Sequence, residues 1–167
     1  MRYWAMLAAA AAAAMLTFGV FTGSGAADHP GSQTLTFTES PRGDLFRFID
    51  ERPLSRGSRN NPSISPGDQV ILGSVLLDQN DQRAGRLEAA CTALRGARRF
   101  PQAQWGCHGF ARLGGGTLAL AASFNFRQNA LIGAVTGGTR AYEGASGSFR
   151  ISGEPSVDRF HIVTPGF

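Results

Sequence analysis

The sequence predicts an all-β protein, an antiparallel up-and-down β-barrel of about eight strands preceded by a signal peptide. Beyond the first 27 residues, apolar and polar residues alternate with a period of two, as in strands with one buried face. No segment shows the 3.6-residue periodicity of an amphipathic helix, and clusters of Gly, Pro, Asn and Asp separate the alternating segments. Closure into a barrel would remove the exposed edges that an open sheet must protect.

Residues 1–27 have the pattern of a secretory signal peptide. Arg2 precedes an apolar run that extends from about Tyr3 to Phe21, and the small residues at 24–27 suit a signal peptidase. The run is almost as long as the roughly 20 residues of a spanning helix, so an uncleaved anchor is the alternative. Cleavage predicts a secreted protein without a stable membrane anchor, whose single domain comprises residues 28–167.

The strand candidates follow one another with short turns, except for one long loop at residues 53–67. A DQND turn at residues 78–81 and three glycines at residues 114–116 predict hairpins. The candidate strands are Gln33–Glu39, Asp44–Ile49, Gln69–Leu77, Arg83–Ala93, Trp105–Leu113, Thr117–Phe126, Ala130–Val135, Gly147–Ser152 and Phe160–Thr164.

The charge and the cysteines narrow the functional class. The net charge of +4 comes from scattered arginines, and no recognition helix accompanies them, so we expect no nucleic-acid partner. The two cysteines, Cys91 and Cys107, are an even count in an exported chain, and we expect them to be bonded to each other. Closing a loop of about 15 residues in this way contributes about 3 kcal/mol in the chain-entropy model.

The common catalytic and cofactor signatures are missing from the sequence. It contains no GxSxG nucleophile elbow, no P-loop and no GxGxxG motif. The three histidines are far apart and lack ligand spacing, so we expect no metal and no cofactor. A disulfide would also occupy both sulfur atoms that could act as nucleophiles.

Two motifs resemble the allene oxide cyclase barrel family, whose wider relatives include the dirigent proteins. The first comprises Gly67-Asp68, Asp78, Arg83 with Gly85, and Cys91; the second is the glycine-rich segment from Thr136 to Gly147. Glu143 within that segment is similar to the cyclase version rather than the dirigent version. The resemblance extends from about Thr34 to Val163 and implies a barrel, commonly a trimer, that cyclises an unsaturated fatty-acid epoxide in its lumen.

The family's site residues are mostly replaced in this chain. The family glutamate on the first strand corresponds to Thr36, and its neighbouring asparagine to Thr38. The family proline corresponds to Leu45, a second asparagine to Ser74 and the tyrosine to Asn125, so only Cys91 is shared. Because a hydroxyl at position 36 cannot act as a base near neutral pH, the resemblance does not extend to the plant reaction, and it assigns no catalytic residue.

The same alignment predicts which side chains face the lumen. It places Thr36, Thr38, Ser74, Cys91 and Asn125 inside, and alternation then adds Val70, Leu72, Leu76, Leu87 and Ser123. Trp105 is expected on the Cys107 side, where its indole lines or plugs the pocket, and His108, Glu39 and Glu88 are expected outside. Alternation turns Leu35, Phe37, Val75, Leu118, Leu120, Phe124 and Phe126 outward, where a homotrimer would cover them. The alternative reverses the faces and predicts a filled, monomeric barrel without a ligand.

Three functional hypotheses follow from these patterns. In the first, the exported barrel binds a small, mostly apolar molecule in its lumen and guides its cyclisation or isomerisation by orientation and exclusion of water. In the second, a lipocalin-like barrel carries such a ligand without changing it. The third is a packed structural extracellular domain without a cavity.

Overall fold

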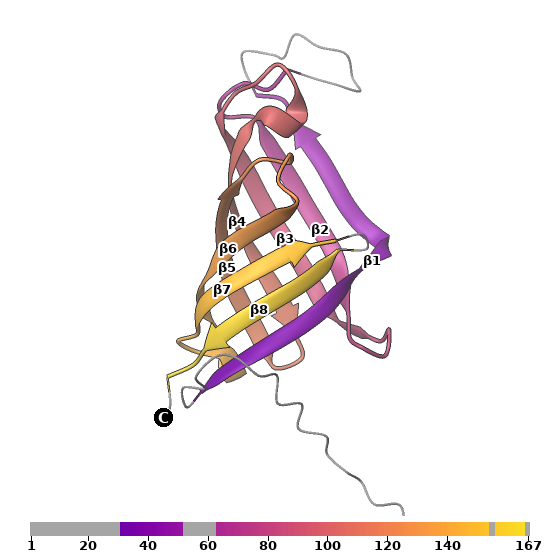
Figure 1. Cartoon of the computed structure of the whole chain (residues 1–167), viewed down its shortest axis with the longest axis vertical. Helices are drawn as coiled ribbons and strands as arrows, with labels where there is room; N and C mark the ends of the chain where they lie inside the picture. The colour runs from indigo at the N-terminus through magenta and orange to yellow at the C-terminus, as the bar shows by residue number, and fades with distance from the viewer. Residues whose placement is uncertain (1–30, 52–62, 154–155, 166–167) are drawn as a thin grey trace, which may run out of the picture.

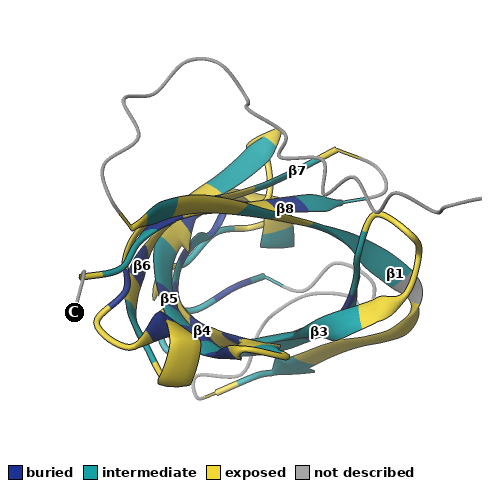
Figure 2. Ribbon diagram, turned by 90° about the horizontal axis from the view of Figure 1, so that it is seen from below, coloured by how far each residue is buried: buried dark blue, intermediate teal, exposed yellow. Residues whose placement is uncertain are grey.

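The computed structural model describes residues 31–51, 63–153 and 156–165, and these form one closed antiparallel barrel (Figure 1). Each strand pairs with the next in the sequence, and β8 pairs with β1 to complete the ring (Figure 2). The predicted fold class is therefore confirmed. The predicted signal peptide lies outside the described residues. The elements are β1 (Ser32–Ile49), β2 (Gln69–Leu77), β3 (Arg83–Arg95), η1 (Phe100–Gln102), β4 (Gln104–Leu113), β5 (Gly116–Phe124), β6 (Ala130–Gly138), η2 (Arg140–Tyr142), β7 (Ser146–Ser152) and β8 (Val157–Val163).

The first two strand candidates are joined into the single long strand β1. The pairing of β1 with β2 is irregular between Ser40 and Leu45, where residues 41–44 stand opposite Ser74 alone. Gly43 allows this bulge because its φ of 89° is one that glycine adopts without strain. An odd number of extra residues exchanges the two faces of the strand, so the side chains of Glu39 and Phe46 both point into the barrel.

Two apolar clusters fill the two ends of the barrel. The first, which we call the lower cluster, contains Leu76, Leu118, Leu120, Val135, Phe149, Phe160 and Ile162, with Leu35 and Phe37 packed against it. The upper cluster contains Ile64, Val70, Cys91, Ala93, Trp105, Cys107 and Phe124. The prediction that Leu35, Phe37, Leu118, Leu120 and Phe124 face outward is thus wrong. It came from the family alignment, which placed polar neighbours of these residues in the lumen. Burial of the large apolar side chains contributes more to stability, so these side chains face inward.

The two cysteines are directly opposite each other on β3 and β4 and form the predicted disulfide. Their Cα atoms are 4.0 Å apart, and they belong to the upper cluster, where Cys91 is 1% exposed. Since side chains of directly opposed residues leave the sheet on the same face, the bond lies inside the barrel. The prediction of a Cys91–Cys107 bond is confirmed.

Asp68 secures the entry to β2. Its buried carboxylate accepts hydrogen bonds from the backbone N–H groups of Glu51 at 2.9 Å and Ser65 at 2.8 Å. Its own backbone carbonyl accepts a hydrogen bond from Ala93 N–H on β3. Asp68 therefore stabilises a junction between the end of β1, the start of β2 and the end of β3, a structural role rather than a chemical one.

Candidate functional site

A cavity of about 410 Å³ lies between the two apolar clusters. Large side chains from β2, β3, β5, β6 and β7 supply most of its wall, and the disulfide contributes to it. These residues are Leu72, Leu87, Leu120, Leu131, Phe149, Ile151, Cys91 and Cys107. A space of this size accommodates a small organic molecule.

The cavity exists because small residues occupy inward positions on three neighbouring strands. Ala89 on β3, Gly109 on β4 and Ala122 on β5 all line it. A side chain at Gly109 would lie 2.6 Å from the backbone carbonyl oxygen of Glu88 and 2.9 Å from the Cβ of Ala89, so this position excludes larger residues. The apolar side chains of β5 face inward, as the alternative prediction required, but the small residues leave a cavity. The barrel is therefore not filled.

The cavity opens to solvent on the side where β7 ends and β8 begins. Ser152, Gly153 and Ser156 border it there, as do the exposed side chains of Gln128 and Asn129 after β5. Phe46 of β1 and Phe126 stand at the same opening and are 58% and 37% exposed. Both rings contact Phe100 of η1, at centroid distances of 5.7 and 4.9 Å. The entrance is thus partly aromatic.

Two carboxyl groups face each other across β1 and β8 beside the cavity. Glu39 lines the cavity, whereas Asp158 lies behind it and is fully buried. The backbone N–H of Glu39 donates to the carbonyl of Ser156 at 2.8 Å, which fixes the start of β8 against β1. Among the described residues, neither carboxylate oxygen of Asp158 has a hydrogen-bond donor.

This pair is electrostatically unusual. Burial, followed by the charge of Glu39 and contact with its carboxyl group, raises the pKa of Asp158 from 3.8 to about 8. Burial, followed by repulsion from Asp44, also raises the pKa of Glu39 above 4.5, although polar contacts with Ser74, Ser156 and Asp158 oppose the change. Asp158 therefore keeps its proton at pH 7, and that proton supplies the donor that its environment lacks.

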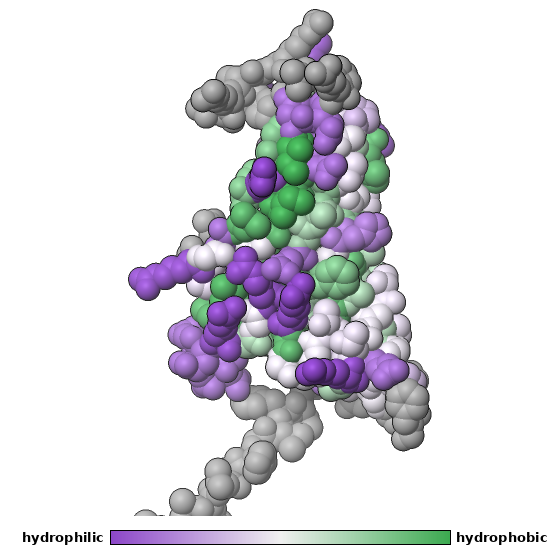
Figure 3. All heavy atoms as spheres, turned by 180° about the vertical axis from the view of Figure 1, so that it is seen from behind, coloured by the Kyte–Doolittle hydropathy of each residue, from purple (hydrophilic) through white to green (hydrophobic). Residues whose placement is uncertain are grey.

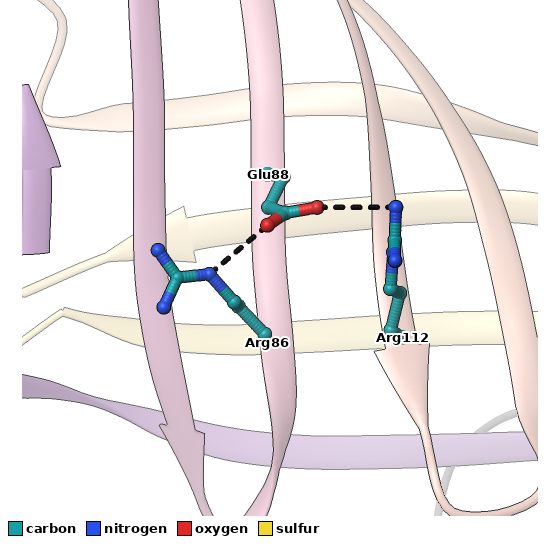
Figure 4. Close-up of polar contacts among 3 residues, drawn as sticks. All are labelled: Arg86, Glu88 and Arg112. Atoms are coloured by element: carbon teal, nitrogen blue, oxygen red, sulfur yellow. Dashed lines mark hydrogen bonds and ion pairs between the residues drawn. The ribbon is translucent and has the colours of Figure 1, made fainter. Parts of the chain in front are cut away.

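The glutamate on the outer face of β3 provides a contrast. Glu88 accepts a hydrogen bond from Arg86 Nε at 3.1 Å and lies 3.4 Å from Arg112 Nη2 (Figure 4). Among the described residues that line the cavity there is no arginine or histidine. Glu88 thus has two cationic partners on the outer face, whereas no ion pair within the described part of the chain involves Glu39 or Asp158.

The structure brings only some of the predicted lumen residues to the cavity. Leu72, Ser74, Cys91 and Asn125 line it. Val70, Leu76 and Trp105 point inward but are fully buried in the two clusters, where Trp105 packs against Phe100. The inward placement of Thr36, Thr38 and Ser123 is wrong: Thr36 pairs with the outward Arg159, Thr38 is on the same face of β1, and Ser123 is exposed.

Neither carboxyl group was predicted to lie in the lumen, although period-two alternation places each of them on an apolar face of its strand. In LTFTE, Leu35, Phe37 and Glu39 share one face, and in VDRFHI, Asp158 shares a face with Phe160 and Ile162. The prediction that Glu39 lies outside is wrong because the alignment placed Thr36 in the lumen. Assigning the faces by the largest apolar residues would have placed both acids inside.

The described part of the chain holds no group of three or more His, Cys, Asp or Glu side chains that could bind a metal. Within the same part of the chain, no helix has the length and hydropathy needed to cross a membrane.

Comparison with known proteins identifies the fold but not a family. No protein-family model matches the sequence, and no curated protein matches it. Among solved structures, pyocyanin demethylase is similar with a TM-score of 0.61 and 16% identity, over 78% of this chain and 100% of that one. A pterocarpan synthase dirigent protein is similar with a TM-score of 0.55 and 15% identity, over 81% of this chain and 87% of that one. The chain therefore shares the barrel fold of these two proteins.

Proposed function

We propose that the barrel binds a small, mostly apolar molecule in its cavity and that Glu39 and Asp158 catalyse proton transfer in an isomerisation or cyclisation. The observation that supports the proposal is the pair of buried carboxyl groups, with raised pKa values, beside an apolar cavity of about 410 Å³. Structural groups in a barrel wall do not need to be acidic, whereas strongly perturbed carboxyl groups next to a cavity are typical of active sites.

The pair can perform acid and base steps without any co-reactant. Glu39 is the member that lines the cavity, so its carboxylate is placed to take a proton from a C–H or O–H group of the ligand. The protonated Asp158 stabilises that carboxylate, and Glu39 then delivers the proton it has taken to another ligand atom, which restores the starting pair. The product then has the same composition as the substrate. The apolar wall holds one ligand conformer and excludes water, which favours ring closure over side reactions.

The comparisons are consistent with this chemistry. The two similar structures are named as a demethylase of pyocyanin and as a pterocarpan synthase, and both names describe action on a small molecule. Membership of the allene oxide cyclase family is part of the proposal and is supported by the shared barrel. The lost carboxylate at Thr36 still argues against the plant reaction, since Glu39 occupies a different position on β1.

We place this activity outside the cytoplasm, after cleavage of residues 1–27. The internal disulfide supports this location because such bonds persist in oxidising compartments. The exposed apolar side chains of Leu94, Phe110 and Ile132 support a homo-oligomer such as a trimer, and apolar side chains gather in the upper half of the face in Figure 3.

A lipocalin-like carrier is the second candidate. It is favoured by the apolar character of the cavity wall, which would retain a ligand without any acid or base. Both candidates predict a bound molecule, and only the first predicts that the molecule is converted.

Native extraction of the mature protein followed by mass spectrometry of co-purifying molecules tests the proposal. The molecule recovered is then incubated with wild type, Ala122→Phe, Glu39→Gln and the outer-face control Glu88→Gln. We expect Ala122→Phe to fill the cavity and abolish binding, and Glu39→Gln to retain binding but slow conversion by about 100-fold or more. Glu88→Gln should match wild type. Binding without conversion by wild type would establish the carrier, and an empty barrel that binds nothing would refute both candidates.

A further inference from the structure

The inner surface of the barrel carries carboxyl groups that form no ion pair with any other described residue. Three such groups lie together: Glu39 in the cavity wall, Asp44 at the opening, and Asp158 behind Glu39. The strands beside them contribute Ser74 from β2 and Ile151 from β7, neither of which is charged. The arginines at the same level, Arg86, Arg150 and Arg159, project from the outward positions of their strands.

Asp158 lies behind Glu39 and does not line the cavity, so its own proton, rather than a ligand, compensates its carboxyl group. It is 0% exposed, points into the barrel, and neither of its oxygen atoms has a hydrogen-bond donor among the described residues. A carboxyl group in such a place costs free energy unless a proton or a cation compensates it. Two other carboxylates have charged or polar partners: Glu88 contacts two arginines, and Asp68 accepts hydrogen bonds from two backbone N–H groups.

The opening has features that suit a cation with an apolar body. The rings of Phe46 and Phe126 are exposed there, and an aromatic face attracts an ammonium group within about 6 Å of its centroid. Beyond the opening, Leu120, Phe149 and Ile151 offer an apolar surface to the remainder of the ligand. An anionic ligand would meet the carboxylates without any compensating cation among the lining residues.

We infer that the ligand of this cavity is a lipophilic organic cation, an ammonium-bearing molecule whose charged group pairs with Glu39 while its apolar body fills the cavity. This inference rests on the proposed function and specifies its substrate class. Asp158 then holds the proton that keeps the pair singly charged, so one negative charge meets one positive charge. A fatty-acid carboxylate is excluded from the site by the same arrangement.

Three probes of matched shape test the inference: 4-phenylbutylammonium, 4-phenylbutanol and 4-phenylbutyrate, titrated into the mature protein by calorimetry at pH 7. We expect the cation to bind at least 10-fold more tightly than the alcohol, and the carboxylate at least 10-fold more weakly than the alcohol. Glu39→Gln should bring the cation to within threefold of the alcohol, whereas the control Glu88→Gln should keep the preference. Ala122→Phe should prevent binding of all three.

The pH dependence adds a second readout. Deprotonation of Asp158 between pH 7 and pH 9 adds a negative charge beside Glu39, so binding of the cation should tighten over this range while binding of the alcohol does not. Asp158→Asn should remove the tightening. Equal or stronger binding of the alcohol would overturn the inference and leave the proposed function intact. Failure of all three probes to bind would overturn both.

Discussion

The burial of Asp158 predicts that the protein loses stability as the pH rises from 4 to 8. The folded-state pKa of about 8 is above the ordinary value of 3.8, so the native protein holds a proton that the unfolded chain has released throughout this range. Stability changes with pH in proportion to the difference in bound protons, and here the native state binds more. The contribution is therefore fully present below about pH 4 and is lost progressively up to about pH 8.

The magnitude follows from the size of the shift. One proton corresponds to about 1.4 kcal/mol per pH unit, and a shift from 3.8 to about 8 corresponds to about 6 kcal/mol in total. The raised pKa of Glu39 acts in the same direction. A loss of this size is comparable with the whole stability of a small domain, typically about 5–15 kcal/mol.

Asp158→Asn isolates this effect because the amide has nearly the shape of the carboxyl group and does not titrate. We expect the variant to equal wild type within about 1 kcal/mol at pH 4 and to exceed it by several kcal/mol at pH 8. Guanidinium unfolding at pH 4, 6 and 8, with the disulfide intact, measures the difference. Glu88→Gln is the control, since its outer-face carboxylate should leave the slope unchanged. Identical pH profiles for wild type and Asp158→Asn would refute the reasoning.

Two further predictions concern stability. Replacing both Cys91 and Cys107 by alanine should lower the free energy of unfolding by about 3 kcal/mol, because a closed loop spanning 16 positions no longer restricts the unfolded chain. Denaturant unfolding measures this difference, and a loss below about 1 kcal/mol would contradict the prediction. Asp68→Ala should lower the free energy of unfolding by about 3 kcal/mol, because the N–H groups of Glu51 and Ser65 lose a charged acceptor. Asp68→Asn retains one acceptor oxygen and should lower it by about half as much. Urea unfolding measures both variants, and equal losses would show that the hydrogen bonds are not the cause.

The sequence determined the architecture because the architecture depends on local patterns. Period-two alternation and turn residues fixed the positions of the strands, and the closed barrel follows from their short connections. The disulfide also followed from the sequence, because two cysteines in a chain expected to be exported predict a bond with each other.

Only the tertiary structure decided what lies inside the barrel. Which side chains of β1 and β5 face inward depends on the register of strand pairing. In β1, one bulge at residues 41–44 exchanges the inward and outward faces for residues 45–49. The same structure brings together Glu39 and Asp158, which are far apart in the sequence and meet because β8 closes the ring on β1. The cavity depends on three small residues from three neighbouring strands, Ala89, Gly109 and Ala122. Alternation predicts which side chains of a strand share a face, whereas strand register and closure of the barrel determine which residues they contact.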